Sequence, residues 1–195
     1  MDELSSAQTA LTALQRVVHL IGDDDLGRPT PCPAFDVAAL ADHLVDFTAR
    51  LGKSVGIHIS APDGSTIEQR ILQVARPVLA RWRQRGLSGD VVFGGRTLPA
   101  RLAAGVLSLE LIVHGWDFAV AIDRSLDVSD AHADYVLALA EQTLTPQSRT
   151  TAGFDEPVPV PDDAGGLDRL VAFTGRNPHS YNPPDRAMGS TQHPP

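Results

Sequence analysis

Apolar residues recur every three or four positions through much of this chain, which is the periodicity of helices that bury one face. One such segment covers residues 3–21, and a second follows Asp36, whose carboxylate can cap a helix. A third begins at a capping box formed by Ser65 and Glu68. Pro77 lies inside this third helix and is expected to kink or divide it, because proline has no backbone N–H to donate.

The second half of the chain is expected to combine two longer helices with an irregular segment. Pro99 is placed to begin a helix over residues 99–122, and Ser129 to cap another over residues 130–144. Residues 145–166 are rich in Pro, Gly and Asp, so they are expected to form a strap without regular structure. A short helix over residues 167–174 should follow.

The remaining segments complete the domain. Paired glycines at 94 and 95 separate residues 91–93 from residues 96–98, a pattern that suits a small hairpin. Residues 179–195 hold too little apolar surface to offset the entropy of ordering, so a disordered tail is expected there. These patterns predict a single all-α domain over residues 1–178, a helical bundle with a Pro-rich strap and a short C-terminal helix.

Charge and composition narrow the classes of function. The formal net charge of -8 and the isoelectric point of about 5.2 provide no basic surface for gripping nucleic acid. The single Cys32 excludes an intrachain disulfide, and the N-terminus has neither the positive flank nor the apolar run of a secretory signal. No uninterrupted apolar run is long enough to span a membrane. We therefore expect a cytoplasmic protein that binds neither nucleic acid nor membrane.

The helix expected over residues 99–122 carries polar groups where apolar ones would be normal. At 100° per residue, Glu110, His114 and Asp117 fall within one arc of roughly 60°, flanked by apolar residues on both sides. These polar groups must therefore face the core. A buried carboxylate needs a positive partner, and a divalent metal ion supplies one. Glu110 and His114 are four residues apart and can reach one ion from a single helix face.

His43 is the third candidate ligand, because it lies at the edge of the apolar stripe of the second helix. Two imidazoles and one carboxylate suit Zn²⁺ with an open position for water or substrate, and the same set suits Fe²⁺, Ni²⁺ or Mn²⁺. Asp117, one turn beyond His114, is expected to orient the second ring nitrogen of His114 or to act as a further ligand.

Simpler interpretations stay open beside the metal site. The histidines can be hydrogen-bonded core residues, and Glu110 can pair with Arg96 or Arg101 instead of a metal ion. Cys32 is expected to be a buried structural residue rather than a nucleophile. A strip of small residues opposite the metal face permits close approach of another helix, either in a homodimer or within the chain. The strip consists of Ala104, Ser108, Gly115 and Ala119.

Several segments together resemble one family. Residues 30–37 (Thr-Pro-Cys-Pro-Ala-Phe-Asp-Val), residues 42–44 (Asp-His-Leu) and residues 109–117 are similar to the hallmarks of the mycothiol-dependent maleylpyruvate isomerase N-terminal family. That family belongs to the DinB-like superfamily of metal-binding four-helix bundles. Residues 154–176 resemble a single-domain branch of metal-binding proteins from mycothiol-using bacteria. The ligands of the family correspond to His43, Glu110 and His114.

The resemblance, which covers about residues 5–178, implies a function. It implies a metal-dependent transferase or isomerase that activates a low-molecular-weight thiol of the mycothiol type against an electrophilic substrate. Two departures matter: Phe35 stands where the family usually has Trp, and the C-terminal domain of the studied isomerases has no counterpart here. Maleylpyruvate isomerisation itself is therefore not expected. The alternative is a protein that binds a metal ion or a small ligand without catalysis.

Overall fold

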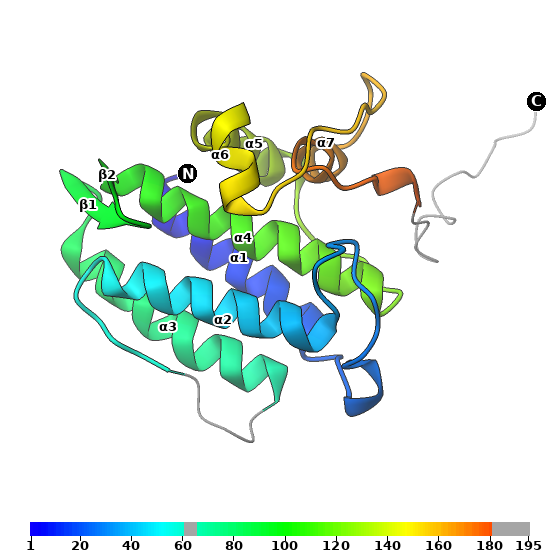
Figure 1. Ribbon diagram of the computed structural model, residues 1–195, viewed down its shortest axis with the longest axis horizontal. Helices are drawn as coiled ribbons and strands as arrows, with labels where there is room; N and C mark the ends of the chain where they lie inside the picture. Colours follow the sequence, from blue (N-terminus) through cyan, green and yellow to red (C-terminus); the bar gives the residue numbers. More distant parts are fainter. Residues whose placement is uncertain (61–65, 181–195) are drawn as a thin grey trace, which may run out of the picture.

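A computed structural model describes residues 1–60 and 66–180 (Figure 1). Within these residues the protein is mainly helical, with seven α-helices and one sheet of two strands. The mainly helical class expected from the sequence is therefore confirmed. The tail expected over residues 179–195 lies almost entirely outside the described residues, and residues Pro178–Ser180 form a short 3-10 turn.

Four helices enclose the main apolar core. They are α1 (Glu3–Val18), α2 (Val37–Lys53), α3 (Ile67–Arg85) and α4 (Ala100–Ala121). Each packs against two of the others: α1 and α2 both contact α3 and α4. Side chains from all four helices fill the centre and are almost fully buried, among them Leu14, Leu40, Leu44, Trp82 and Phe118. Removal of these side chains from water provides most of the stability of the helical core.

The remaining helices cover α4 on the side away from α2 and α3. They are α5 (Asp130–Thr143), α6 (Pro146–Ala152) and α7 (Gly166–Phe173) (Figure 1). Both α5 and α7 contact α4 directly. Covered from both sides, α4 is the one helix of the described residues that is long and apolar enough to cross a membrane, yet 89% of its most apolar window is buried inside the protein.

Side-chain caps fix where the helices begin, largely as expected. Asp36 accepts a hydrogen bond from the backbone N–H of Ala39 at the start of α2, and Ser129 caps α5. The capping box of α3 lies one residue later than predicted and is formed by Thr66 and Gln69. The predicted cap, Ser65, lies outside the described residues.

Two expectations about regular structure need correction. Of the two effects expected of Pro77, division of the helix does not occur: α3 is continuous from Ile67 to Arg85, and buried neighbours of Pro77 hold both halves against the core. The predicted strap contains helix α6, because Pro146 suits a first helical position and Thr145 exchanges hydrogen bonds with Ser148. The high proline content of residues 145–166 led to the expectation of irregular structure, although Thr145 and Ser148 form a local helix cap.

The expected hairpin is present. Strands β1 (Asp90–Phe93) and β2 (Arg96–Pro99) pair antiparallel, and both Gly94 and Gly95 have positive φ at the turn between them. The hairpin leads directly into α4. The small-residue strip of α4 is buried inside the chain, where Gly115 faces Leu126 and Leu14, so the intramolecular alternative accounts for it.

Candidate metal centre

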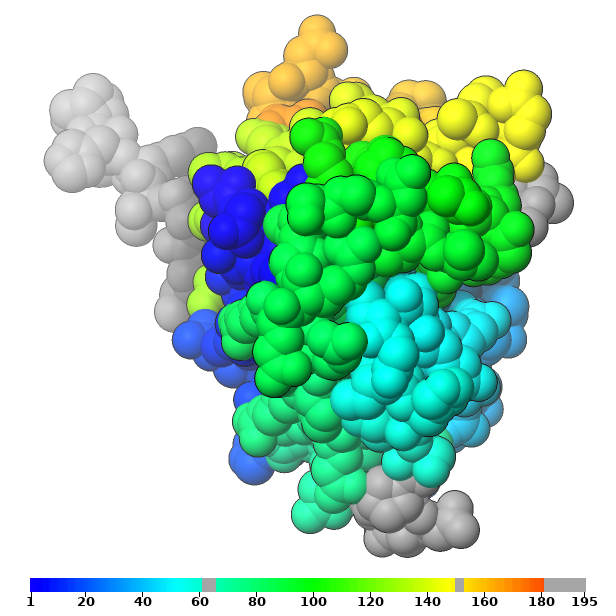
Figure 2. All heavy atoms as spheres, turned by 90° about the vertical axis from the view of Figure 1, so that its left-hand side faces the viewer, coloured from blue at the N-terminus to red at the C-terminus, as the bar shows by residue number. Residues whose placement is uncertain are grey.

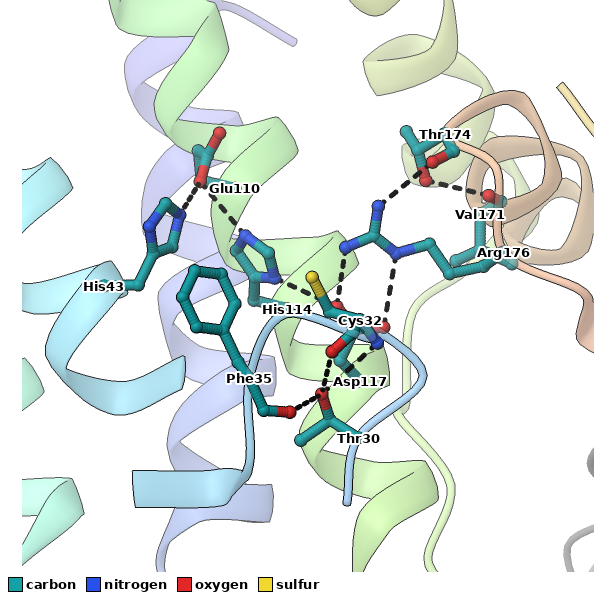
Figure 3. Close-up of polar contacts among 10 residues, drawn as sticks. All are labelled: Thr30, Cys32, Phe35, His43, Glu110, His114, Asp117, Val171, Thr174 and Arg176. Atoms are coloured by element: carbon teal, nitrogen blue, oxygen red, sulfur yellow. Dashed lines mark hydrogen bonds and ion pairs between the residues drawn. The ribbon is translucent and has the colours of Figure 1, made fainter. Parts of the chain in front are cut away.

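Three predicted side chains come together between α2 and α4 (Figure 3). Oε2 of Glu110 lies 3.4 Å from Nε2 of His43 and 3.2 Å from Nε2 of His114. One ligand atom from each residue lies within 4.8 Å of the others. The two imidazole rings meet edge to face, with centroids 5.1 Å apart. The cluster therefore presents two ring nitrogens and one carboxylate to a common point.

Local structure explains how His43 reaches this point. The loop before α2 places the Phe35 ring against the His43 ring, stacked at a centroid distance of 4.9 Å. Oγ1 of Thr30 lies 2.8 Å from the carbonyl oxygen of Phe35 and 3.0 Å from that of Cys32, which closes the loop. Asp36 then begins the helix that carries His43. The sequence showed Phe35 only as a replacement for the usual Trp of the family and did not show that it contacts a candidate ligand.

Burial and hydrogen bonding set the charges of the other two residues. Glu110 and His114 are 4% and 3% exposed. Burial alone would raise the pKa of Glu110, but hydrogen bonds from His114 and His43 lower it to about 2. Burial would lower the pKa of His114, but hydrogen bonds to Asp117 and Glu110 raise it to about 9. Without a metal ion, a carboxylate thus faces an imidazolium at neutral pH.

Asp117 lies behind His114 rather than among the converging atoms. Its Oδ2 is 2.9 Å from Nδ1 of His114, so it holds the ring with Nε2 toward Glu110. Of the two roles expected for Asp117, the geometry matches the orienting one. Burial would raise the pKa of Asp117, but the charge of Arg176 and the hydrogen bond from His114 keep it lowered.

Arg176 contacts Asp117 behind the candidate centre and was not predicted from the sequence. Its Nη2 donates to Oδ2 of Asp117 at 2.9 Å and its Nε to Oδ1 at 3.3 Å, while Nη1 donates to the carbonyl oxygen of Thr174. Arg176 is 5% exposed, so the charge pair is buried. Gly175 permits this placement, because it has φ +87° and an added Cβ would lie 2.5 Å from Cβ of Asp155. A buried Asp117 needs a positively charged partner, but no pattern in the neighbouring sequence identified Arg176 as that partner.

The arginines considered as partners of Glu110 lie elsewhere. Arg101 is exposed and lies 3.8 Å from Glu3 in an ion pair, and Arg96 is exposed on the hairpin. Over residues 1–60 and 66–180, the only ion pairs of Glu110 are those with the two histidines. The interpretation of Glu110 as an arginine partner is therefore wrong.

The donor set suits a divalent ion with an anionic additional ligand. In the metal-free protein the charges of Arg176, Asp117, Glu110 and protonated His114 cancel. A divalent ion that displaces the His114 proton would leave a net charge of about +1 in this buried site. An anion at the open position would neutralise that charge, since isolated buried charge is costly.

A pocket of about 750 Å³ opens beside the cluster, with His43 and Glu110 in its wall. Apolar side chains from five parts of the chain line it, including Phe47, Phe93, Val106, Leu144 and Phe154. Figure 2 shows the end of the molecule where the hairpin, the end of α2 and α6 meet. Two of the three candidate ligands, His43 and Glu110, therefore border the pocket, whereas His114 lies buried behind them.

Cys32 lies close to the Asp117 and Arg176 pair (Figure 3) and is 6% exposed. Burial raises the pKa of its thiol, which disfavours the thiolate. It lines a separate pocket of about 310 Å³ together with Arg149 and Arg176. These observations fit the structural role expected for Cys32.

Comparison with known proteins gives relatives but no assigned activity. Two uncharacterized proteins of Mycobacterium tuberculosis, Rv0738 from strain H37Rv and MT0763 from strain CDC 1551, are each 29% identical to this chain over 181 residues. The match covers 90% of this chain and 98% of each relative. No family model and no solved structure matches. The similarity therefore covers nine tenths of the chain rather than the candidate centre alone.

Proposed function

We propose that this protein binds one divalent metal ion, with Zn²⁺ as the first candidate, through His43, Glu110 and His114. The observation that carries the proposal is the convergence of Nε2 of both histidines with the Glu110 carboxylate at the wall of a pocket. These three residues come from two helices and are separated by up to 71 positions, which is 114 minus 43. Ordinary core histidines have no need of such convergence.

We further propose that the domain is a DinB-like four-helix bundle. The mutual contacts of α1, α2, α3 and α4 support this assignment, as does the position of the three candidate ligands on α2 and α4. The resemblance to the mycothiol-dependent maleylpyruvate isomerase N-terminal family rests on the same segments. The hydrogen bond from His114 to Asp117 gives its His-Gly-Trp-Asp segment a physical role.

The proposed chemistry is activation of a low-molecular-weight thiol of the mycothiol type for transfer or isomerisation. A bound divalent ion lowers the pKa of a thiol ligand and so supplies a thiolate nucleophile at neutral pH. The thiol proton would pass to solvent. In a transfer, the sulfur would form a bond to the electrophilic carbon while the leaving group departs from that carbon with the bonding electron pair; in an isomerisation, the sulfur would add to an activated C=C bond, whose electron pair moves to the adjoining carbonyl, and would leave again after rotation. Asp117 fixes the His114 ring, Phe35 fixes the His43 ring, and apolar side chains line the pocket beside the reacting groups.

One observation favours a second candidate function, a non-catalytic metal or small-ligand binder. Among the described residues that line the pocket, His43 and Glu110 are used by the proposal as ligands, and the remaining group suited to general acid-base catalysis, Lys53, lies ten positions beyond His43 along α2. A thiolate transfer can proceed without a further base, because the ion itself acidifies the thiol. Turnover with a thiol and an electrophile panel separates the two functions.

Metal analysis of protein purified without an affinity tag tests the proposal. We expect about one ion per chain in the native protein and none in His114→Ala. His19→Ala is the matched control, because His19 is an exposed histidine that pairs with Glu68 outside the cluster. Retention of the ion by His114→Ala, or the absence of any tight ion from the folded native protein, would overturn the metal assignment.

A further inference from the structure

We propose that the pocket beside the candidate centre holds an elongated organic anion, whose acidic group pairs with Arg50 and Lys53 while its apolar body lies against Phe47 and Phe93. The inference rests on the proposed function, because it places the other end of the same ligand at the candidate metal centre, beside His43 and Glu110. It adds a substrate class that the cluster of three ligands does not itself specify.

The charges of the pocket wall carry the first step. The chain as a whole has 24 acidic against 16 basic residues. Among the described residues lining this pocket, however, Glu110 is the only acid, whereas Arg50 and Lys53 are both present. The acid lies at the candidate metal centre, so the remainder of the pocket is positive. An anion is favoured there and a cation is repelled.

The second step is that both cations are available. Neither Arg50 nor Lys53 forms an ion pair with another described residue, whereas Arg28, Arg70 and Arg176 each pair with an aspartate. Both side chains are exposed at the mouth of the pocket. An arginine can bind a carboxylate through two parallel N–H donors, and a neighbouring lysine adds a second charge.

The third step is the spacing along α2, which sets the length of the ligand. His43, Phe47, Arg50 and Ser54 follow one another at intervals of three or four and all line the pocket. With a rise of 1.5 Å per residue, the backbone of Arg50 lies roughly 10 Å beyond that of His43. A ligand that reaches from the centre to the cations therefore needs a body of several carbon atoms.

Aromatic and aliphatic groups occupy the interval between the two ends. Phe47 meets Phe93 of the hairpin edge to face, with ring centroids 5.6 Å apart. Val92, a neighbour of Phe93, is 63% exposed and also lines the pocket. The exposure of this apolar side chain is explained if the apolar body of a ligand covers Val92. The pocket thus offers a charged end, an apolar middle and the candidate metal centre.

A matched set of thiols tests the assignment in the Co²⁺-loaded protein, where sulfur bound to cobalt gives a charge-transfer absorption band. The probes are ω-mercaptooctanoate, its neutral amide, and the short mercaptopropionate. We expect ω-mercaptooctanoate to bind about tenfold more tightly than its amide, and mercaptopropionate to show no advantage over its own amide, because it cannot reach the cations. The double substitution Arg50→Gln with Lys53→Gln should abolish the preference, whereas Arg16→Gln on α1 should not.

Lys53 allows a second readout that does not depend on metal, because it is the only lysine in the chain. Octanoate, which has no thiol, should slow acylation of Lys53 severalfold relative to the N-terminal amine, measured by mass spectrometry of the peptides. Octanamide should give no protection. The N-terminal amine is an internal control in the same sample.

The outcomes separate this inference from the proposed function. If the amide and the acid give the cobalt band with equal affinity, the thiol function stands and the anion site is overturned. A preference for the acid that persists without Arg50 and Lys53 also overturns it, since the carboxylate would then bind elsewhere. If no thiol gives the band while octanoate still protects Lys53, the anion site stands and the proposed thiol chemistry fails.

Discussion

Asp117 holds Nδ1 of His114 at 2.9 Å and leaves Nε2 of the same ring 3.2 Å from Glu110. Because Asp117 is in turn paired with Arg176, a buried row of alternating charges runs from the C-terminal segment to the candidate centre. The row fixes both the tautomer and the direction of the imidazole. It therefore connects the C-terminal segment to His114, one of the three candidate ligands.

Asp117→Asn should weaken metal binding by about tenfold to a hundredfold, because an amide holds and polarises the imidazole less well than a carboxylate. Chelator competition with Zn²⁺ measures the change. Asp127→Asn removes an exposed partner of Arg16 and should leave the affinity unchanged. Equal affinities for Asp117→Asn and the native protein, both folded by circular dichroism, would refute the orienting role.

Metal binding should release a proton and strengthen as pH rises. The pKa of His114 in the metal-free protein is raised to about 9 from a reference value of 6.5, so at pH 7 the ion must displace the His114 proton. The apparent affinity should rise about tenfold per pH unit from pH 7 and level off near pH 9. Calorimetry in two buffers of different ionisation enthalpy measures the proton released, and no release at pH 7 would contradict the charge assignment.

The same shift makes the stability of the metal-free protein depend on pH. Because the folded pKa of His114 lies above the unfolded value, its contribution is fully present below about pH 6.5 and is lost as pH rises through about 9. Urea unfolding of the metal-free protein should show this loss across the interval. His114→Gln should show a smaller decline, and identical slopes for the two proteins would count against a protonated His114.

Gly175→Ala should destabilise the protein by about 1–3 kcal/mol and weaken metal binding through Arg176. The residue has φ +87°, and the new Cβ would overlap Asp155. Gly56→Ala is a matched control, because Gly56 has a similar φ of +79° with nothing near an added Cβ. Thermal unfolding separates the cost of positive φ, which both variants share, from the cost of overlap with Asp155. If Gly175→Ala lowers the unfolding temperature no more than Gly56→Ala does, contact with Asp155 does not constrain the turn that carries Arg176.

The features that could be predicted from sequence are those that depend on neighbours along the chain. Apolar periodicity and caps such as Asp36 and Ser129 placed the main helices, because both act within one or two turns. The spacing of Glu110 and His114 in an otherwise apolar helix indicated an inward polar face for the same reason. Their burial follows directly from that pattern.

The features that were missed depend on contacts between distant segments. Arg176 meets Asp117 across 59 positions, through a glycine turn whose geometry no periodic pattern reveals. The stacking of Phe35 on His43 likewise depends on how a loop folds back over a helix. Helix α6 is short, and its capping residues are masked by a composition rich in proline. Local propensity alone cannot rank such tertiary contacts.

Phe35→Leu should lower Zn²⁺ affinity by about threefold to tenfold, because the stacked ring that restrains His43 is worth roughly 1 kcal/mol. Phe35→Trp keeps an aromatic face at this position and should restore most of the affinity. Chelator competition on both variants, with circular dichroism to confirm folding, makes the comparison direct. The tryptophan variant controls for disturbance of the loop held by Thr30. If the Phe35→Leu and Phe35→Trp variants both bind Zn²⁺ as tightly as the native protein, α2 alone sets the direction of the His43 ring. The loop that carries Phe35 would then contribute nothing to metal binding.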